Sequence, residues 1–233
     1  MPIETLTRHD MAKLVADDVP ANSYVNLGIG MPTLVADYLP AGKGIVLHSE
    51  NGLLGMRALK EGEPVDPDML NATKEPVALD EGASVSDHVV SFAMMRGGHI
   101  DLTVLGAFQV SGRGDIANWD TGDSDSIPGV GGAMDLVVGA KRVFVMMQHV
   151  DRDGRPKIVP ECVYPLTGCA AVHRVYTDLA VIDITSSGLV VRAMLDGLDF
   201  DELQNRTAVP LRLASDCRVL ERSTDSEKSR SIE

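Results

Sequence analysis

Short apolar runs that end in a glycine or a polar cluster restrict the fold of this sequence more than any other feature. They lie at residues 25–29, 45–47, 102–105, 143–147, 180–184 and 189–191. Runs of this length that are rich in β-branched residues are typical of buried strands. Because glycine-rich or helix-length segments separate them, the pattern predicts an α/β fold with a mixed, largely parallel sheet that helices cover.

The sequence also marks where three helices begin. Thr7 followed three residues later by Asp10 is a capping pattern, and it predicts a short amphipathic helix near the start of the chain. Pro32 comes just after the first apolar run and its glycine turn, a position that suits the first turn of a helix. Asp199 and Glu202 repeat the capping pattern and predict a last helix.

Composition narrows the class of protein. The chain has 34 acidic and 21 basic residues, a net charge of −13 and 44% hydrophobic residues. These values are typical of a globular domain, and the lack of a basic cluster argues against a nucleic-acid surface. The longest stretch without Asp, Glu, Lys, Arg or His, 20–36, is too short and too polar for a membrane helix, and no secretory signal is readable, so we expect a cytoplasmic protein. We expect one domain over 1–213 and a polar, poorly ordered tail over 214–233.

The cysteines give no sign of a disulfide framework or a metal site. Cys162, Cys169 and Cys217 make an odd count, which predicts reduced thiols. Cys162, Cys169 and His173 come nearest to a metal-binding set, but the six residues between the two cysteines exceed the short loops that structural zinc prefers. We therefore expect no bound metal.

Glu50 is the sharpest candidate for chemistry. It follows the buried run at 45–47 and precedes Asn51 and Gly52, so it stands at the carboxyl end of a predicted strand. Ligands bind at that edge of open α/β sheets, and a carboxylate there could serve as a base, a metal ligand or a covalent nucleophile. The alternative is a turn whose glutamate faces water, with Asn51 and Gly52 in turn conformations.

A second candidate is the glycine-rich turn at 128–132. Its backbone N–H groups, at the entry to a helix that begins at Ala133 or Met134, would favour a developing oxyanion. Close packing of a helix on the sheet also requires glycine, so this alternative stays open.

Several segments resemble one protein family when they are taken together in their order along the chain. They are NLGIGMPTLVADYLP, LHSENGLLGM, MLNATKEPV, SFAMMRGGHIDLTVLGAFQVSGRGDIANW, GVGGAMDLV and PECVYPLTG. Their order and spacing are similar to those of the β subunits of family I CoA-transferases over almost all of 11–213. The resemblance implies a three-layer open, mixed sheet of the CoA-transferase and sugar-phosphate isomerase-like type. It also implies an α subunit as partner in an α2β2 hetero-oligomer, coenzyme A as a substrate, and no other cofactor or metal.

The resemblance assigns roles to individual residues. It implies that Glu50 is the covalent nucleophile and that the backbone N–H groups of Gly132 and Ala133 lie near the thioester oxygen. The residues that the resemblance and the turns place at substrate or CoA are Asn51, Lys74, Asn118 and Gly131. Arg57 and Thr73 stand where the family commonly has glycine, so the backbone near them could differ.

The implied reaction moves CoA from succinyl-CoA to a 3-oxo acid through a glutamyl-CoA thioester. Residues 146–148 before His149, the loop at 118–132 and the segment at 159–168 resemble the members of the family that act on 3-oxoadipate more than those that act on acetoacetate, which implies 3-oxoadipate as the acceptor. Acetoacetate remains an alternative, as does a ligand sensor or sugar-phosphate isomerase on a related scaffold. The far carboxylate of a dicarboxylate needs a cation, and Arg57, Arg96, Arg113 or a residue of the partner would serve.

Overall fold

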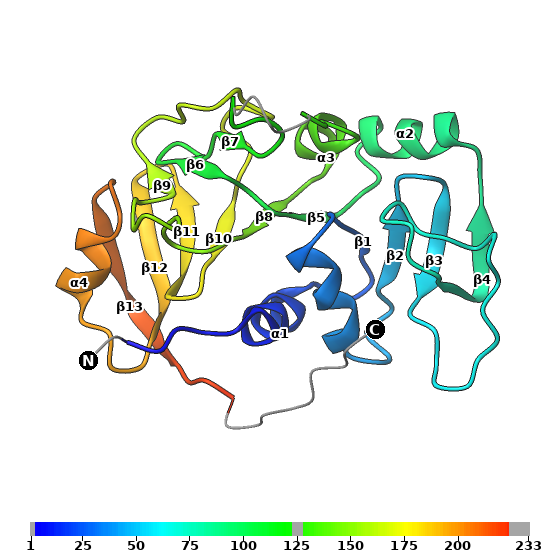
Figure 1. Ribbon diagram of the computed structural model, residues 1–233, viewed down its shortest axis with the longest axis horizontal. Helices are drawn as coiled ribbons and strands as arrows, with labels where there is room; N and C mark the ends of the chain where they lie inside the picture. Colours follow the sequence, from blue (N-terminus) through cyan, green and yellow to red (C-terminus); the bar gives the residue numbers. More distant parts are fainter. Residues whose placement is uncertain (1–2, 123–127, 224–233) are drawn as a thin grey trace.

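A ten-stranded sheet is the framework of the protein (Figure 1). The structure, a computed structural model, describes residues 3–122 and 128–223. The strand order is β13-β12-β11-β10-β8-β5-β1-β2-β3-β4. In chain order these strands are β1 (Tyr24–Leu27), β2 (Val46–Ser49), β3 (Leu53–Arg57), β4 (Ala78–Val85), β5 (Leu102–Leu105), β8 (Val143–Met146), β10 (Arg174–Tyr176), β11 (Ala180–Thr185), β12 (Gly188–Leu195) and β13 (Leu211–Leu220).

The centre of the sheet is parallel and its flanks are mixed. Strands β10, β8, β5, β1 and β2 pair in parallel, whereas β3 and β4 on one side and β11 and β12 on the other pair antiparallel. The outermost strand β13 is again parallel to β12. The predicted mixed, largely parallel sheet is therefore confirmed. A separate three-stranded sheet, in the order β7-β6-β9, consists of β6 (Gln109–Ser111), β7 (Ile116–Ala117) and β9 (Ile158–Val159).

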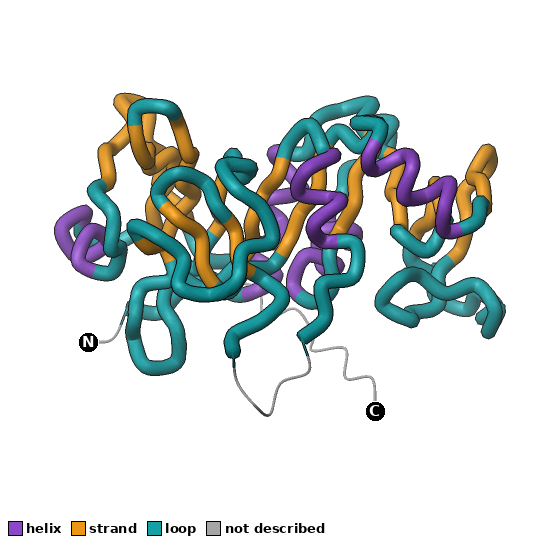
Figure 2. The backbone as a smooth tube through the Cα atoms, turned by 90° about the horizontal axis from the view of Figure 1, so that it is seen from above, coloured by secondary structure: helices purple, strands orange, loops and turns teal. Residues whose placement is uncertain are grey.

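Helices cover the sheet on both faces. They are α1 (Arg8–Asp18), the 3-10 helix η1 (Met31–Tyr38), α2 (His88–Arg96), α3 (Ala133–Gly139) and α4 (Phe200–Asn205). The chain leaves β1 in one direction across the sheet through η1 to β2, and later in the other direction from β5 through α3 to β8. Right-handed crossovers in opposite directions place η1 and α3 on opposite faces. Figure 1 shows α1 with η1 below the central strands and α2 with α3 above them, and Figure 2 looks down on the α2 and α3 side.

All three predicted helix starts agree with the structure, but one of the two expected side-chain caps is absent. Thr7 caps α1 in a capping box in which its side chain accepts from the Asp10 N–H and the Asp10 carboxylate accepts from the Thr7 N–H. Pro32 lies in the first turn of η1. Helix α4 does follow Asp199, but the Asp199 side chain makes no capping hydrogen bond. The capping pattern therefore predicted the start of α4 correctly, although the capping hydrogen bond itself does not form.

The expected boundary at residue 213 is wrong. The sheet continues through β13 (Leu211–Leu220), so residues 214–220, which we expected in a disordered tail, pair with β12. Only Leu211 and Leu220 of this strand are buried, because an edge strand gains its stability from backbone pairing and leaves most side chains in water. Hydrophobic periodicity and composition therefore do not predict a strand of this kind. Residues 224–233 of the expected tail, and residues 123–127 of the loop used for the family resemblance, lie outside the described residues.

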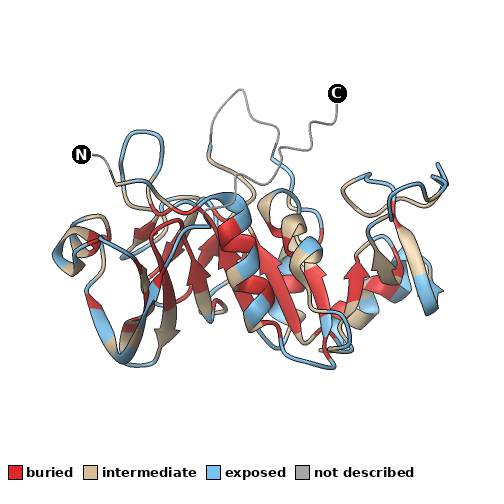
Figure 3. Cartoon of the chain, turned by 90° about the horizontal axis from the view of Figure 1, so that it is seen from below, coloured by how far each residue is buried: buried red, intermediate tan, exposed pale blue. Residues whose placement is uncertain are grey.

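The hydrophobic core follows the parallel strands. All four residues of β5 and of β8 are buried, and α1 contributes a buried face that includes Met11 and Val15 (Figure 3). Residues of β4 are half-buried or exposed, so the β3–β4 end of the sheet adds little to the core. The buried centre is what fixes the positions of the strand ends.

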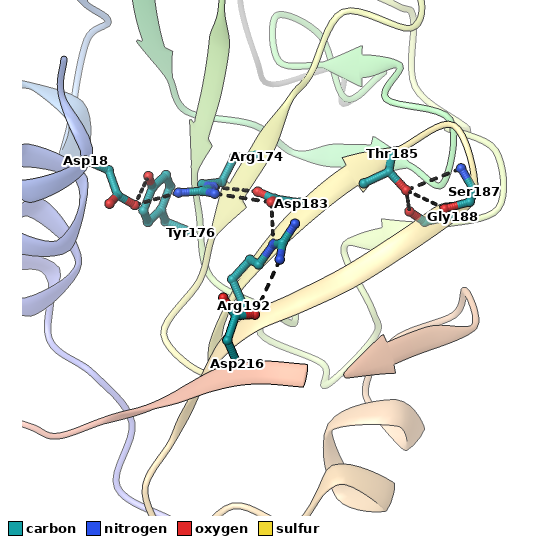
Figure 4. Close-up of polar contacts among 9 residues, drawn as sticks. All are labelled: Asp18, Arg174, Tyr176, Asp183, Thr185, Ser187, Gly188, Arg192 and Asp216. Carbon is teal, nitrogen blue, oxygen red and sulfur yellow. Dashed lines mark hydrogen bonds and ion pairs between the residues drawn. The ribbon is translucent and has the colours of Figure 1, made fainter. Parts of the chain in front are cut away.

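A charged network joins α1 to the antiparallel half of the sheet (Figure 4). Arg174 on β10 donates to Asp18 of α1 at 2.7 Å and to Asp183 of β11 at 2.5 Å. Arg192 on β12 also donates to Asp183, at 2.7 Å, and the Tyr176 hydroxyl donates to Asp18 at 2.8 Å. Burial opposes the charged form of both Arg174 and Asp183, but their mutual hydrogen bonds outweigh it, so the pKa of Arg174 is raised and the pKa of Asp183 is lowered and both side chains stay charged.

Candidate active site

Glu50 lies on the tight turn between β2 and β3, at the carboxyl edge of the parallel strands. A hydrogen bond of 3.0 Å from the Gly52 N–H to the Ser49 carbonyl closes this turn. Gly52 has a φ of +115°, and a Cβ at that position would lie 2.1 Å from the carbonyl oxygen of Ser86. Only glycine fits at position 52, where the chain reverses directly after Glu50. The Glu50 side chain is half-buried at the sheet edge.

The glycine turn before α3 lies against the Glu50 carboxylate. The Gly132 N–H donates to Oε2 of Glu50 at 3.2 Å. A Cβ on Gly132 would lie 2.3 Å from that oxygen, and a Cβ on Gly131 would lie 3.6 Å from Oε1. The two strongest sequence candidates, far apart in the chain, therefore meet, and glycine at 132 is required by the approach of the carboxylate.

The Ala133 N–H has a different partner. It donates to the carbonyl of Val130 at 3.0 Å, within the turn itself. Of the two backbone N–H groups that the family resemblance implies near the thioester oxygen, that of Gly132 faces the carboxylate in this structure.

Both neighbours of Glu50 hold the loop at 70–76. The Asn51 side-chain amide donates to the Leu70 carbonyl at 2.7 Å, and the Ser49 hydroxyl accepts from the Ala72 N–H at 2.9 Å. The loop is thereby fixed to the Glu50 turn at two points. The Asn51 side chain therefore positions the backbone of this loop. Its place in the sequence motif did not indicate that role.

Lys74 is the tip of that loop. It is exposed, has a φ of +65°, and makes no ion pair within the described parts of the chain. The preceding Thr73, which stands where the family commonly has glycine, donates through its hydroxyl to Oδ1 of Asn71 at 2.6 Å. The left-handed residue is therefore Lys74 and not Thr73, and the threonine is accommodated by a hydrogen bond.

Asn118 lies at the same sheet edge, beyond the end of β5. Its side-chain amide donates to the Gly106 carbonyl at 3.1 Å, and its side-chain oxygen accepts from the Thr167 hydroxyl at 2.6 Å. Both polar groups of the side chain thus hold the backbone and the neighbouring loop. No hydrogen bond joins Asn118 to the Glu50 turn among the residues that the structure describes.

Sequence reasoning did not find the α2 residues that border the site. The Cζ of Phe92 lies 3.2 Å from where a Cβ of Gly132 would be, so its ring is next to the Glu50 carboxylate. The His88 ring stacks on Phe92 at 4.2 Å between centroids, and the Arg96 guanidinium lies 5.5 Å from the Phe92 centroid. His88, Phe92 and Arg96 are spaced at i, i+4 and i+8, which places them on one face of a helix, and this spacing is the sequence signal that could have identified them.

The three arginines considered for a far carboxylate are in different settings. Arg57 binds Glu63 through both terminal nitrogens, at 2.7 and 2.8 Å. Arg113 pairs with Glu161 at 3.4 Å on the surface. Arg96 pairs through Nε with Asp135 of α3 at 2.6 Å, and of the three it alone is linked by contacts to the Glu50 turn.

The described residues also bear on three other kinds of feature: reactive thiols, metal sites and membrane-spanning helices. All three cysteines are free, and burial raises the pKa of Cys162 to about 11, so that thiol is a weak nucleophile. Among residues 3–122 and 128–223, no group of three His, Cys, Asp or Glu side chains is arranged to hold a metal ion. The same residues include no helix with the length and apolar character needed to cross a membrane.

Comparison with known proteins gives consistent matches. A family model described as coenzyme A transferase matches residues 8–205. One subunit of the 3-oxoadipate CoA-transferase of Pseudomonas putida is 56% identical over 206 residues, which cover 88% of this chain and 96% of that protein. The subunit of the same name from Acinetobacter baylyi is 54% identical, over 91% and 97%. One subunit of a probable succinyl-CoA:3-ketoacid coenzyme A transferase of Bacillus subtilis is 46% identical, over 86% and 92%.

A solved structure has a similar fold. The acyl-CoA transferase YdiF of Escherichia coli O157:H7 superposes with a TM-score of 0.71 at 17% identity, covering 94% of this chain. The chain spans 44% of the length of that protein. At this identity the match concerns the fold alone.

Proposed function

The chain belongs to the coenzyme A transferase family, and on that premise we propose that it supplies the covalent nucleophile, Glu50, of an enzyme that transfers CoA from succinyl-CoA to 3-oxoadipate. One observation carries the assignment of the nucleophile. The Glu50 carboxylate stands at the carboxyl edge of the sheet and accepts the Gly132 N–H at 3.2 Å. The family assignment replaces the sequence alternative of a ligand sensor or a sugar-phosphate isomerase.

The first half of the proposed cycle loads CoA onto Glu50. A carboxylate oxygen of Glu50 attacks the thioester carbonyl of succinyl-CoA, the C–S bond breaks, and CoA leaves as thiolate from a mixed anhydride. The thiolate then attacks the glutamyl carbonyl carbon, and succinate leaves as a carboxylate. Glu50 now holds CoA as a thioester.

The second half returns CoA to the acceptor. The 3-oxoadipate carboxylate attacks the glutamyl thioester, thiolate leaves, and a second mixed anhydride forms. Attack of the thiolate on the acceptor carbonyl then releases the new acyl-CoA and the Glu50 carboxylate. Each electron pair comes from a carboxylate or a thiolate, so the cycle uses no cofactor beyond its two substrates.

The position of Gly132 suits the two steps in which Glu50 itself is attacked. In both, negative charge develops on the glutamyl oxygen, which is the atom that Gly132 contacts as Oε2. A fixed backbone donor stabilises such an oxyanion without reorienting, and the loss of one donor of this kind typically costs ~3 kcal/mol of transition-state stabilisation. Gly131, Ala133, Asn51 and Asn118 shape or hold this surface, and Lys74 at the loop tip is our candidate to attract an anionic part of the substrate.

We propose that an α subunit completes the enzyme. Each of the relatives is named as one subunit of its transferase, which supports a second subunit, and an α2β2 assembly follows the family resemblance. A partner over the exposed carboxyl edge would exclude water from the acyl intermediates, which water would otherwise hydrolyse. The three free thiols support a reducing compartment, the cytoplasm.

The test of the nucleophile is a trapping experiment on the purified two-subunit complex. Incubation with succinyl-CoA should make this chain heavier by CoA less one water, and peptide mapping should locate the adduct on Glu50. The variant Glu50→Ala should show neither adduct nor transfer. The matched control Glu81→Gln, an exposed acid on β4, should behave like the unaltered complex. Transfer by the Glu50→Ala complex would refute the proposal.

The test of the acceptor is a comparison of 3-oxoadipate with acetoacetate, with succinyl-CoA as donor. The relatives from Pseudomonas and Acinetobacter support a higher kcat/KM for 3-oxoadipate, and the relative from Bacillus keeps acetoacetate as the second candidate. A higher kcat/KM for acetoacetate would reject the dicarboxylate acceptor and leave the covalent mechanism in place.

A further inference from the structure

A row of buried polar side chains lies beneath the Glu50 turn. The side-chain amide of Asn26 on β1 is 3.2 Å from Nδ1 of His48 on β2, and Nε2 of His48 is 2.9 Å from the hydroxyl of Ser91 on α2. The exposed fractions of these residues are 3%, 1% and 1%. Buried polar groups of this kind cost stability unless each has a partner, and here each has one.

The hydrogen-bonding capacity of the row fixes its direction. The Asn26 amide nitrogen donates to the His48 carbonyl at 3.2 Å as well as facing Nδ1, so Nδ1 must accept. Nε2 then carries the proton and donates to Ser91, whose hydroxyl proton is left for the Ser49 carbonyl at 3.4 Å. A neutral imidazole satisfies every contact, and burial keeps it neutral by lowering the pKa of His48 to about 4.

This row joins two elements that form the site, β2 and α2. His48 belongs to β2, which ends at Glu50, and Ser91 belongs to α2, which places Phe92 beside Glu50. Helix α2 in turn is fixed to α3 by the ion pair of Arg96 with Asp135, at 2.6 Å. Helix α3 begins one residue after Gly132. The His48–Ser91 hydrogen bond is therefore a buried link between the strand of the nucleophile and the helix pair that presents the N–H group, and the Ser91 hydroxyl adds a second one to the Ser49 carbonyl.

We propose that His48 and Ser91 are positioning residues that hold Gly132 and Phe92 in register with Glu50. The inference rests on the proposed function, since it concerns the geometry of the same carboxylate. Neither residue needs to touch substrate. Their effect passes through α2, and a displacement of about 1 Å at a reacting group costs on the order of a hundredfold in rate.

The experiment compares four variants in the two-subunit complex. Ser91→Ala removes the hydroxyl, His48→Leu removes both ring nitrogens, and His48→Gln restores a side-chain N–H that can reach Ser91. The matched control is His149→Gln. His149 is another fully buried histidine between two hydroxyls, those of Thr177 at 2.9 Å and Thr207 at 2.8 Å, so its two ring nitrogens bond to these threonines and not to the Glu50 turn.

The readouts are kcat, KM and the rate of Glu50–CoA adduct formation per folded complex, with thermal unfolding to set the folded fraction. We expect Ser91→Ala and His48→Leu to lower kcat and the adduct rate at least tenfold with KM for succinyl-CoA within twofold. His48→Gln should recover to within about threefold of the unaltered kcat. His149→Gln should lower the melting temperature without lowering kcat.

Three results would overturn the positioning role, and the first two concern kcat. One is an unchanged kcat in folded Ser91→Ala, and the other is an equal loss of kcat in His149→Gln, which would show a general effect of the buried substitution. If the unaltered complex forms no adduct on Glu50, the proposed function fails and this inference with it. If the adduct forms at the same rate in Ser91→Ala, only the positioning role fails.

Discussion

Substitution of Gly132 with alanine is the most selective perturbation that the structure offers. Gly132 has a φ of −86° and a ψ of +5°, a bridge-region conformation with negative φ that is open to alanine as well as to glycine. The added Cβ would lie 2.3 Å from Oε2 of Glu50, 3.2 Å from its Cδ and 3.2 Å from Cζ of Phe92. The three atoms nearest to the methyl group therefore belong to two side chains, the Glu50 carboxylate and the Phe92 ring.

The magnitude follows from these distances. A carbon and an oxygen in contact need more than about 3 Å, so the carboxylate must move by about 1 Å, away from the Gly132 N–H. A misplacement of this size costs on the order of a hundredfold, and the loss of an oxyanion donor costs about a hundredfold to a thousandfold in kcat. The free energy of unfolding should change by less than about 1 kcal/mol, because Gly132 is a helix N-cap position.

The assay is steady-state transfer of CoA by the two-subunit complex, together with trapping of the Glu50 adduct. The control is Gly129→Ala in the same loop, where an added Cβ meets nothing within 4 Å and φ is not positive. We expect Gly132→Ala to lower kcat at least a hundredfold while Gly129→Ala stays within twofold of the unaltered complex. A Gly132→Ala complex that retains kcat within threefold would refute the placement of Glu50 against this turn.

Three further predictions concern stability and substrate binding. Burial lowers the pKa of His48 and His149 to about 4, from 6.5 when unfolded, so the unfolded chain takes up protons first as the pH falls below 6.5. The free energy of unfolding should then decrease by up to about 2 kcal/mol per histidine between pH 7 and 5 in urea titrations, and a flat profile would contradict this. Asp183→Asn leaves Arg174 and a second arginine without their shared carboxylate, and should cost about 3 kcal/mol by the same titration at pH 7; a loss under about 0.5 kcal/mol would show that the network does not stabilise the sheet. Lys74→Gln should raise KM for an anionic substrate about tenfold with an unchanged melting temperature, and an unchanged KM would remove Lys74 from the binding surface.

The sequence predicted the central part of the fold because that part is buried on both faces. The predicted runs at 102–105 and 143–147 correspond to β5 and β8, whose residues are all buried, so their apolar character was complete. Strands β4 and β13 were missed because most of their side chains are half-buried or exposed. Hydrophobic periodicity in a sequence indicates which side chains are buried. Backbone pairing holds β4 and β13 in the sheet, and it requires no apolar pattern in the sequence.

The candidate site was predicted unevenly for a related reason. Glu50 and the glycine turn were each readable as local motifs, since a strand end and a run of glycines are properties of neighbouring residues. The functional roles of all the predicted site residues stay predictions: Glu50, Asn51, Lys74, Asn118, Gly131, Gly132 and Ala133. Phe92, Ser91 and His48 carried no local signal, because their importance arises only where α2 packs over the turn after β2.

The sequence by itself determined the central strands and the turns that follow them, because steric limits on glycine and the spacing of apolar runs act over a few residues. It also determined the family, through segments that keep their order along the chain. Only the tertiary structure decided that the Gly132 N–H faces the Glu50 carboxylate, that a buried histidine and serine join their elements, and that the chain past residue 213 forms an edge strand. Such contacts join residues tens of positions apart, and their geometry depends on how the whole sheet packs against its helices.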